Sequence, residues 1–250
     1  RQMCIRDSII IISIFVRRQL TISNPLLNLN VFKGRIFCFS TITSMIIMLS
    51  MVGPALLIPL YVQNALGLSA LLSGLVIMPG AIINGIMSVF TGRFYDKYGP
   101  RPLIYAGFSL LTICTLLLCF LKADTSYIYL IVIYAIRMFA VSLLMMPINT
   151  TGINALDNKD ISHGTAIMNF GRVMAGSLGT ALMVTFMSIG SKWIGPSSSA
   201  HASKELLHRQ SVAAGVDVSF ALVTGFVVVA FLFALFIKEP NRKSQNMREV

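Results

Sequence analysis

The sequence predicts an all-α membrane protein, a bundle of six transmembrane helices. Hydrophobic residues make up 56% of the 250 residues and charged residues only 12%, a balance that ordinary soluble domains do not show. The hydrophobic residues collect in runs of about 20, the length of helix that crosses a hydrocarbon core about 30 Å thick. The basic residues behind the net charge of +11 lie between these runs. We therefore expect membrane lipid, and no nucleic acid, as a partner.

The runs divide the chain into three regions. Residues 1–35 form a connector, residues 36–237 the transmembrane bundle and residues 238–250 a polar, basic tail on the cytoplasmic side. The run 8–16 is too short to span a membrane, so we expect it to be the tail of a truncated linker helix in a fragment of a longer protein. The predicted spans are about 36–62, 70–91, 102–121, 127–149, 163–190 and 217–237.

The first two predicted spans carry helix-breaking and small residues. Pro54 and Pro59 lie inside the first span, where proline kinks a helix and frees carbonyl groups. In the second span, Gly80, Asn84 and Ser88 recur every four residues. Such rows let membrane helices approach closely, so we expect this row to pack against a neighbouring helix.

A charged segment, residues 92–101, separates the second and third spans, and we expect it to be a tight loop. Its key residues are Gly92, Arg93, Asp96, Gly99 and Arg101. Gly92 would end one helix, and Gly99 can take the positive φ that a sharp reversal needs. Asp96 would lie near the positive end of the next helix, where an anion is stabilised. The alternative is a basic turn that only orients the helices.

Five residues inside the fourth and fifth spans are the candidates for a cavity or for ion coupling. They are Arg137, Met145, Asn149, Asn169 and Arg172. A charge near the bilayer centre costs about 2.5–3.5 kcal/mol, so such arginines usually face a cavity or a partner. A structural hydrogen bond to the carbonyls of a broken helix is the open alternative for both arginines, and caps or turns explain the asparagines equally well.

The fifth span also holds a second row of small residues, Gly171, Ala175 and Gly179, which we expect to pack against another helix. Methionines are frequent in these two spans and could form a soft surface for apolar ligands, or could simply pack or face lipid. Residues 191–216 read as the longest loop, and Asp217 reads as the start of the last helix. No acidic residue then lies deep in a span.

Basic residues are distributed unequally between the two sets of turns. One side receives Arg17, Arg18, Lys33, Arg35, Arg93, Lys97, Arg101, Lys159, Lys238, Arg242, Lys243 and Arg248, and the other Lys122, Lys192, Lys204 and Arg209. By the positive-inside rule the first side is cytoplasmic. The spans also form two triplets of opposite orientation, 36–121 and 127–237, which is the layout of an inverted repeat.

The spacing of the charged segment, Gly-x-x-x-Asp-x-x-Gly-x-Arg, resembles the signature loop of the major facilitator superfamily. Further motifs resemble the later part of the fourteen-helix drug:proton antiporters of the EmrB/QacA type: the segments 17–19, 24–32, 59–63, 67–69, 79–80, 99–102 and 145–147. The family usually has a second basic residue where Pro100 stands. The resemblance implies the six-helix C-terminal half of a proton-driven multidrug or antibiotic efflux antiporter in a bacterial plasma membrane.

This resemblance also implies the partners: a small hydrophobic or amphipathic drug-like substrate, protons, and a missing N-terminal half that supplies the coupling acid. Two rival interpretations remain, a truncated chain that does not transport and, less favoured, a membrane-embedded enzyme. An enzyme would need an acid, nucleophile or metal set within the spans. The cysteines and histidines form no metal-binding pattern, so we expect no catalytic residues, metal or cofactor.

Overall fold

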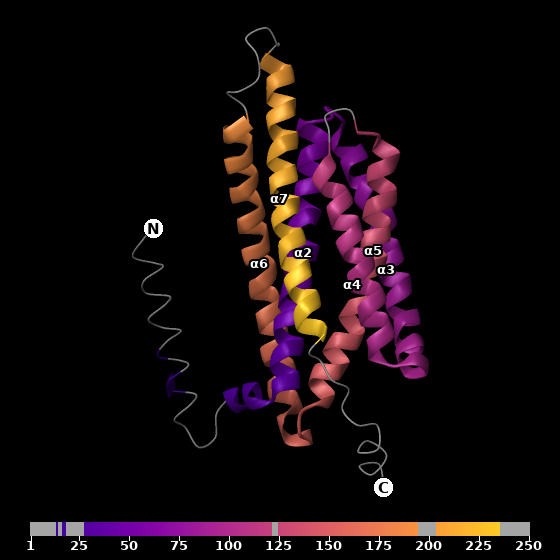
Figure 1. Cartoon of the computed structure of the whole chain (residues 1–250), viewed down its shortest axis with the longest axis vertical. Helices are drawn as coiled ribbons and strands as arrows, with labels where there is room; N and C mark the ends of the chain where they lie inside the picture. Colours follow the sequence, from indigo (N-terminus) through magenta and orange to yellow (C-terminus); the bar gives the residue numbers. More distant parts are fainter. Residues whose placement is uncertain (1–13, 15–16, 19–27, 122–124, 195–203, 236–250) are drawn as a thin grey trace.

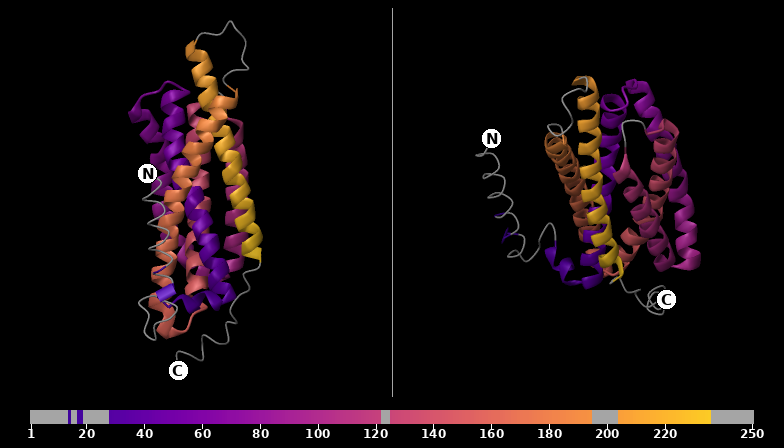
Figure 2. Two further views of the ribbon diagram at one scale, coloured as in Figure 1. Left: turned by 90° about the vertical axis from the view of Figure 1, so that its left-hand side faces the viewer. Right: turned by 45° about the horizontal axis from the view of Figure 1, so that its top comes forward.

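The structure, a computed structural model, describes residues 14, 17–18, 28–121, 125–194 and 204–235. Its long helices run side by side and form a bundle (Figures 1 and 2). In this part of the chain six helices are long and apolar enough to cross a membrane, as the sequence predicts. The elements are η1 (Leu29–Lys33), α2 (Arg35–Asn64), α3 (Ala70–Tyr98), α4 (Pro100–Leu117), η2 (Leu118–Phe120), α5 (Tyr127–Asn154), η3 (Asn158–Asp160), α6 (Ile161–Ile194) and α7 (Lys204–Leu235).

Successive long helices run in opposite directions. Element η1 and the connections α3–α4 and α5–α6 lie at the lower end of the bundle in Figure 1, and the α2–α3 connection lies at the upper end. The lower end is therefore the one that the charge distribution of the sequence predicts to be cytoplasmic.

Helices α2 and α5 form the centre of the bundle. Half of the most apolar stretch of each is buried, against 17% in α3. Helix α2 packs against α5, α6 and α7, whereas α5 packs against α2, α3 and α4. The residues that a candidate site can use therefore come mainly from these two helices and their direct neighbours.

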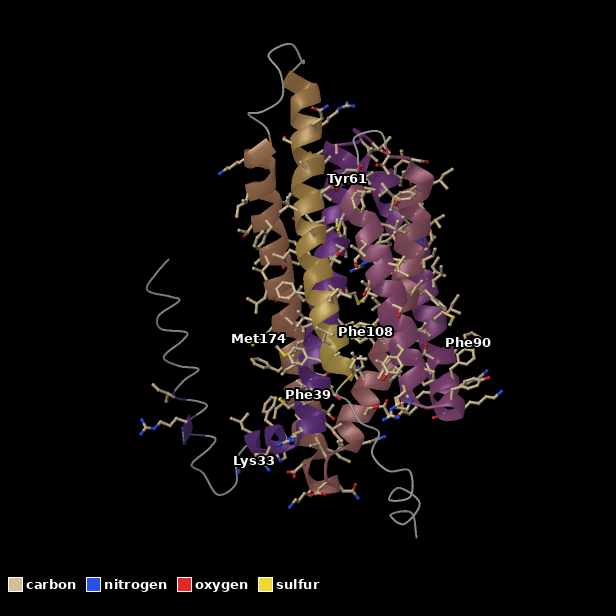
Figure 3. The ribbon with its side chains drawn as sticks, viewed as in Figure 1. Lys33, Phe39, Tyr61, Phe90, Phe108 and Met174 are labelled. Atoms are coloured by element: carbon tan, nitrogen blue, oxygen red, sulfur yellow. The ribbon has the colours of Figure 1, made fainter. Side chains whose placement is uncertain are left out.

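Two large hydrophobic clusters fill the bundle. The upper cluster joins the ends of α2, α4, α5 and α7 around Tyr61, Tyr134 and Phe220, and Figure 3 shows Tyr61 near that end. The lower cluster joins α2, α4, α5, α6 and α7 around Phe108 and Ile47. In contrast, α3 and α6 keep apolar faces exposed, and Figure 3 shows Phe90 and Met174 projecting outward from them. Such faces suit lipid or another apolar surface.

A third, smaller cluster anchors the connector at the lower end. Val31 of η1 packs there with Phe37 of α2, Leu156, Ile167 and Met168. The side chain of Asn28 donates a hydrogen bond of 2.9 Å to Asp160, in the α5–α6 connection. Element η1 is thus fixed against the ends of α5 and α6. The predicted linker tail at residues 8–16 lies, but for Ile14, outside the described residues.

The prediction of a loop at residues 92–101 is wrong. Helix α3 continues through Gly92, Arg93 and Asp96 to Tyr98, and α4 begins at Pro100. Gly99 alone makes the reversal, with φ +79°, as the sequence predicts for this residue. The expectation failed because charged residues continue a helix readily once it has left the hydrocarbon core, so the end of an apolar run does not mark the end of a helix.

The prediction of a long loop at residues 191–216 is also wrong. Helix α6 extends to Ile194 and α7 begins at Lys204, so Asp217 lies well inside α7 and not at its start. The reason is the same as at the α3–α4 junction: most of residues 204–211 are polar, so the apolar run alone placed the start of the helix too late. Helix α7 is therefore 32 residues long.

Candidate functional site

A cavity of about 340 Å³ lies between α2, α3 and α5. This volume is at the lower end of the range typical of pockets for small molecules. Helix α5 supplies most of the wall. The face that it turns toward α2 and α3 carries several polar residues. The lining residues are Met51 from α2, Asn84 and Ser88 from α3, and Ser142, Met145, Met146, Asn149 and Thr150 from α5.

The lining combines uncharged hydrogen-bonding groups with methionine. Amide and hydroxyl groups can donate to or accept from the polar atoms of a ligand. Methionine side chains are flexible and polarizable, so they adapt to apolar groups of varied shape. None of the lining residues is charged. This wall of the cavity therefore suits an amphipathic small molecule, and it contains no acid for proton transfer.

Asn149 links the cavity to α2. The hydroxyl of Ser44 donates a hydrogen bond of 3.1 Å to the amide oxygen of Asn149. This contact orients the amide group and joins the two central helices near the lower end of the cavity. Of the predicted candidates, Met145 and Asn149 both line the cavity.

In the row Gly80, Asn84 and Ser88, the first two residues contact α5. A Cβ atom at Gly80 would lie 2.8 Å from Cδ1 of Tyr134, so only glycine permits this approach. The side-chain amide of Asn84 donates a hydrogen bond of 3.2 Å to the carbonyl of Met138. Ser88 bonds the carbonyl of Gly85 in its own helix and lines the cavity.

The row Gly171, Ala175 and Gly179 faces α2. A Cβ atom at Gly179 would lie 2.9 Å from the carbonyl oxygen of Leu49, and one at Gly171 would lie 3.1 Å from the sulfur of Met45. Ala175 between them is buried. The row allows α6 to pack closely on α2, away from the cavity wall.

The two candidate arginines lie in different surroundings. Arg137 is fully buried, is not among the cavity-lining residues, and donates a hydrogen bond from Nη2 to the carbonyl of Ser50 in α2. Arg172 is half-buried and donates a 2.8 Å hydrogen bond to Asn169, an exposed residue three positions earlier in α6. The structure thus pairs Asn169 with Arg172 and keeps both away from the cavity lining.

The charged segment surrounds the short α3–α4 junction. Arg93 lies over the ring of Phe90, 5.8 Å from its centroid, and Asp96 is exposed in the last turn of α3. The amide of Gly99 donates a 2.8 Å hydrogen bond to the carbonyl of Tyr95, which ends α3. Arg101 is exposed in the first turn of α4. Gly92 lies close to the cavity, since a Cβ atom there would be 3.3 Å from the sulfur of Met146.

Sequence reasoning missed the place of Asp217. Asp217 is half-buried inside α7 and accepts a 3.1 Å hydrogen bond from the amide of Leu121, at the end of η2. The apolar residues 212–216 before it could have revealed that the helix starts earlier. For Arg137 the structure favours the alternative that the sequence left open, a hydrogen bond to a carbonyl of a broken helix, since Ser50 lies four residues before Pro54. The described residues contain no group of three or more potential metal ligands.

Membrane-length helices that run side by side, with a cavity between three of them, define a class, the multi-pass α-helical membrane proteins. Within this class, residues 12–180 match the family model of the Major Facilitator Superfamily, and the chain belongs to this family of membrane transporters. The matched range covers more than half of the chain, including the cavity and the charged segment.

The chain is also similar to curated bacterial proteins. It is 37% identical over 232 residues to the lincomycin resistance protein LmrB of Listeria innocua, covering 93% of this chain and 49% of LmrB. It is 43% identical over 171 residues to the uncharacterized MFS-type transporter YhcA of Bacillus subtilis, covering 68% of this chain and 32% of YhcA. It is 26% identical over 196 residues to the multidrug export protein EmrB of Escherichia coli K12, covering 78% of this chain and 37% of EmrB.

These relatives confirm the resemblance to multidrug transporters of the EmrB type. The chain spans about half the length, or less, of the curated relatives that it matches. A family of transporters and relatives named for resistance or export point to a protein that is not an enzyme.

Proposed function

We propose that the chain is the C-terminal portion of a secondary active transporter, a proton-driven efflux antiporter for drugs or antibiotics that works by alternating access. The observation that carries this proposal is the cavity between α2, α3 and α5, with its uncharged polar groups and methionines. Family membership and the names of the relatives support the same function. The substrate is then a small hydrophobic or amphipathic molecule.

In this proposal residues 36–237 form one of two bundles that rock against each other around a site at the membrane midplane. The second bundle is an N-terminal half carried by a longer protein, since the chain covers 49% of LmrB. Residues 1–35 connect the two, and the tail after residue 237 lies in the cytoplasm. The exposed apolar faces of α3 and α6 are available to pack against a second bundle or against lipid.

Roles for the candidate residues follow from their positions. Met145 and Asn149 contact the substrate. Asn169, which is exposed, and Arg172, which is half-buried, take part in contacts that change during the transport cycle. The segment from Gly92 to Arg101 acts as a conformational latch at the cytoplasmic end. Asp217 lies inside α7, contrary to the expectation that no acid lies within a span, but it is not among the residues that line the cavity. In this proposal the acid that couples transport to protons still belongs to the other half.

The proposal is tested by comparing the 250-residue chain with the full-length transporter in sealed vesicles. We expect saturable, proton-dependent efflux of a fluorescent amphipathic drug from the full-length protein and none from the chain alone. Coexpression of the chain with the separate N-terminal half should restore part of the activity. Efflux by the chain alone would contradict the two-bundle mechanism.

A second candidate function is a transport-inactive chain that acts only as an assembly module, and the partial coverage of the relatives favours it. The same experiment distinguishes the two functions. Activity restored by coexpression of the two halves would support the first function. If the full-length protein transports but the coexpressed halves do not, the separate chain is inactive in transport, as the second function requires.

A further inference from the structure

Arg137 and Pro54 act on the same carbonyl group. Proline has no amide N–H, so Pro54 leaves the carbonyl of Ser50, four residues earlier in α2, without its intrahelical donor. Arg137 reaches across from α5 and donates a hydrogen bond from Nη2 to this carbonyl. Its side chain is fully buried. The arginine therefore supplies the donor that the proline removes.

The adjacent residue of α5 holds the opposite side of the cavity. The carbonyl of Met138 accepts the 3.2 Å hydrogen bond from Asn84 of α3. Asn84 lines the cavity, and so does Met51, the residue directly after Ser50. Two consecutive residues of α5 thus bind the two helices that face each other across one end of the cavity.

We propose that Arg137 is a positioning residue, which replaces the amide proton missing at Pro54 and so holds α2 at a fixed distance and register from α5. An unsatisfied carbonyl is costly in the apolar interior of a membrane protein, where water cannot replace the donor. The pair therefore keeps Met51 in the cavity wall while Pro54 interrupts the backbone hydrogen bonds of α2. This role requires no contact between Arg137 and substrate, and it does not depend on the proposed efflux function.

The proposal predicts that substitutions at the two positions are not additive. Pro54→Ala restores an N–H that can bond the Ser50 carbonyl within α2, so Arg137 is then needed less. In the otherwise unchanged chain in detergent, Arg137→Met should lower the midpoint of thermal unfolding by at least about 5 °C. In the Pro54→Ala background, Arg137→Met should lower the midpoint of thermal unfolding by less than about half of that amount. Arg137→Lys, which keeps one donor group, should fall between these results.

Pro59 provides the matched control. It lies in the same helix and leaves the carbonyl of Ala55, which Arg137 does not bond, without its intrahelical donor. Pro59→Ala should therefore leave the effect of Arg137→Met unchanged. An equal loss in the Pro54→Ala and Pro59→Ala backgrounds, or no loss on Arg137→Met alone, would overturn the proposal. If Arg137→Met does not yield folded protein, the same comparison is made with Arg137→Lys.

A second measurement tests the position of the cavity wall. In a cysteine-free background, Met51→Cys reports on the backbone next to Ser50 through its rate of reaction with a small thiol reagent. Arg137→Met should change this rate about threefold or more, and adding Pro54→Ala should return it toward the original value. A rate that does not respond to Arg137→Met would show that the arginine does not position this wall.

Discussion

At Gly179 helix α6 approaches α2 closely because glycine has no Cβ atom. A Cβ atom there would lie 2.9 Å from the carbonyl oxygen and 3.1 Å from Cα of Leu49, both backbone atoms that cannot move aside. Gly179→Ala should therefore destabilise the bundle by about 1–3 kcal/mol, the usual cost of overpacking. The midpoint of thermal unfolding in detergent measures this loss.

Gly85 is the control for this prediction, because a Cβ atom there would meet nothing within 4 Å. Gly85→Ala should be neutral or slightly stabilising, since alanine favours a helix more than glycine does. If both substitutions had the same effect, the close packing of α6 on α2 at Gly179 would be refuted.

Asn149 is the residue at which the cavity can be tested most directly. It lines the cavity and accepts the hydrogen bond from Ser44. Asn149→Ala in the full-length transporter should weaken substrate binding about two- to tenfold, the effect of losing one hydrogen bond of about 0.5–1.5 kcal/mol. Asn154→Ala, at the exposed end of the same helix, should leave binding unchanged. Equal effects at the two positions would place the substrate site elsewhere.

At the scale of the element, the α3–α4 junction gives the third prediction. Asp96 lies in the last turn of α3, four residues before α4 begins, and the latch hypothesis has its charge interact with the positive end of α4. We expect Asp96→Asn to shift the conformational equilibrium of the full-length transporter about two- to fivefold. Transport should fall while membrane abundance and substrate affinity stay near normal.

Asp157→Asn is the control, because Asp157 is an exposed acid at another turn of the same end of the bundle. It should leave transport unchanged. Parental transport by Asp96→Asn, or a loss of substrate affinity, would refute the latch.

The same junction shows how far sequence reasoning reaches. The apolar runs predicted six membrane-length helices correctly, because burial in lipid requires such runs. They did not predict the ends of α3 and α7, since these helices continue through polar residues such as Arg93 and Lys204. Rows of small residues could be read from their spacing. Which helix each row faces, and that Asn84 bonds the carbonyl of Met138, depends on tertiary packing that spacing does not contain.

At the scale of the whole molecule, the arrangement of basic residues predicts its orientation. Residues at the lower end in Figure 1 should face the cytoplasm. In a cysteine-free background of the full-length transporter, Lys97→Cys, exposed near the end of α3, should resist a membrane-impermeant thiol reagent in intact cells and react after permeabilisation. Asn64→Cys, which is exposed as the last residue of α2 at the upper end of the bundle, should react in intact cells. The reverse pattern would invert the topology.

The central place of α2 also determines how the bundle is assembled during synthesis. Among the six membrane-length helices described here α2 is made first, yet two of its packing partners, α6 and α7, are made after the other three. About 100 residues separate the end of α2 from the start of α6, which takes roughly 5–20 s at 5–20 residues per second. During that time residues of α2 that later pack on α6, such as Leu49 against Gly179, lack these neighbours. We therefore expect the face of α2 that packs on α6 and α7 to contact lipid or the insertion machinery until those helices are made.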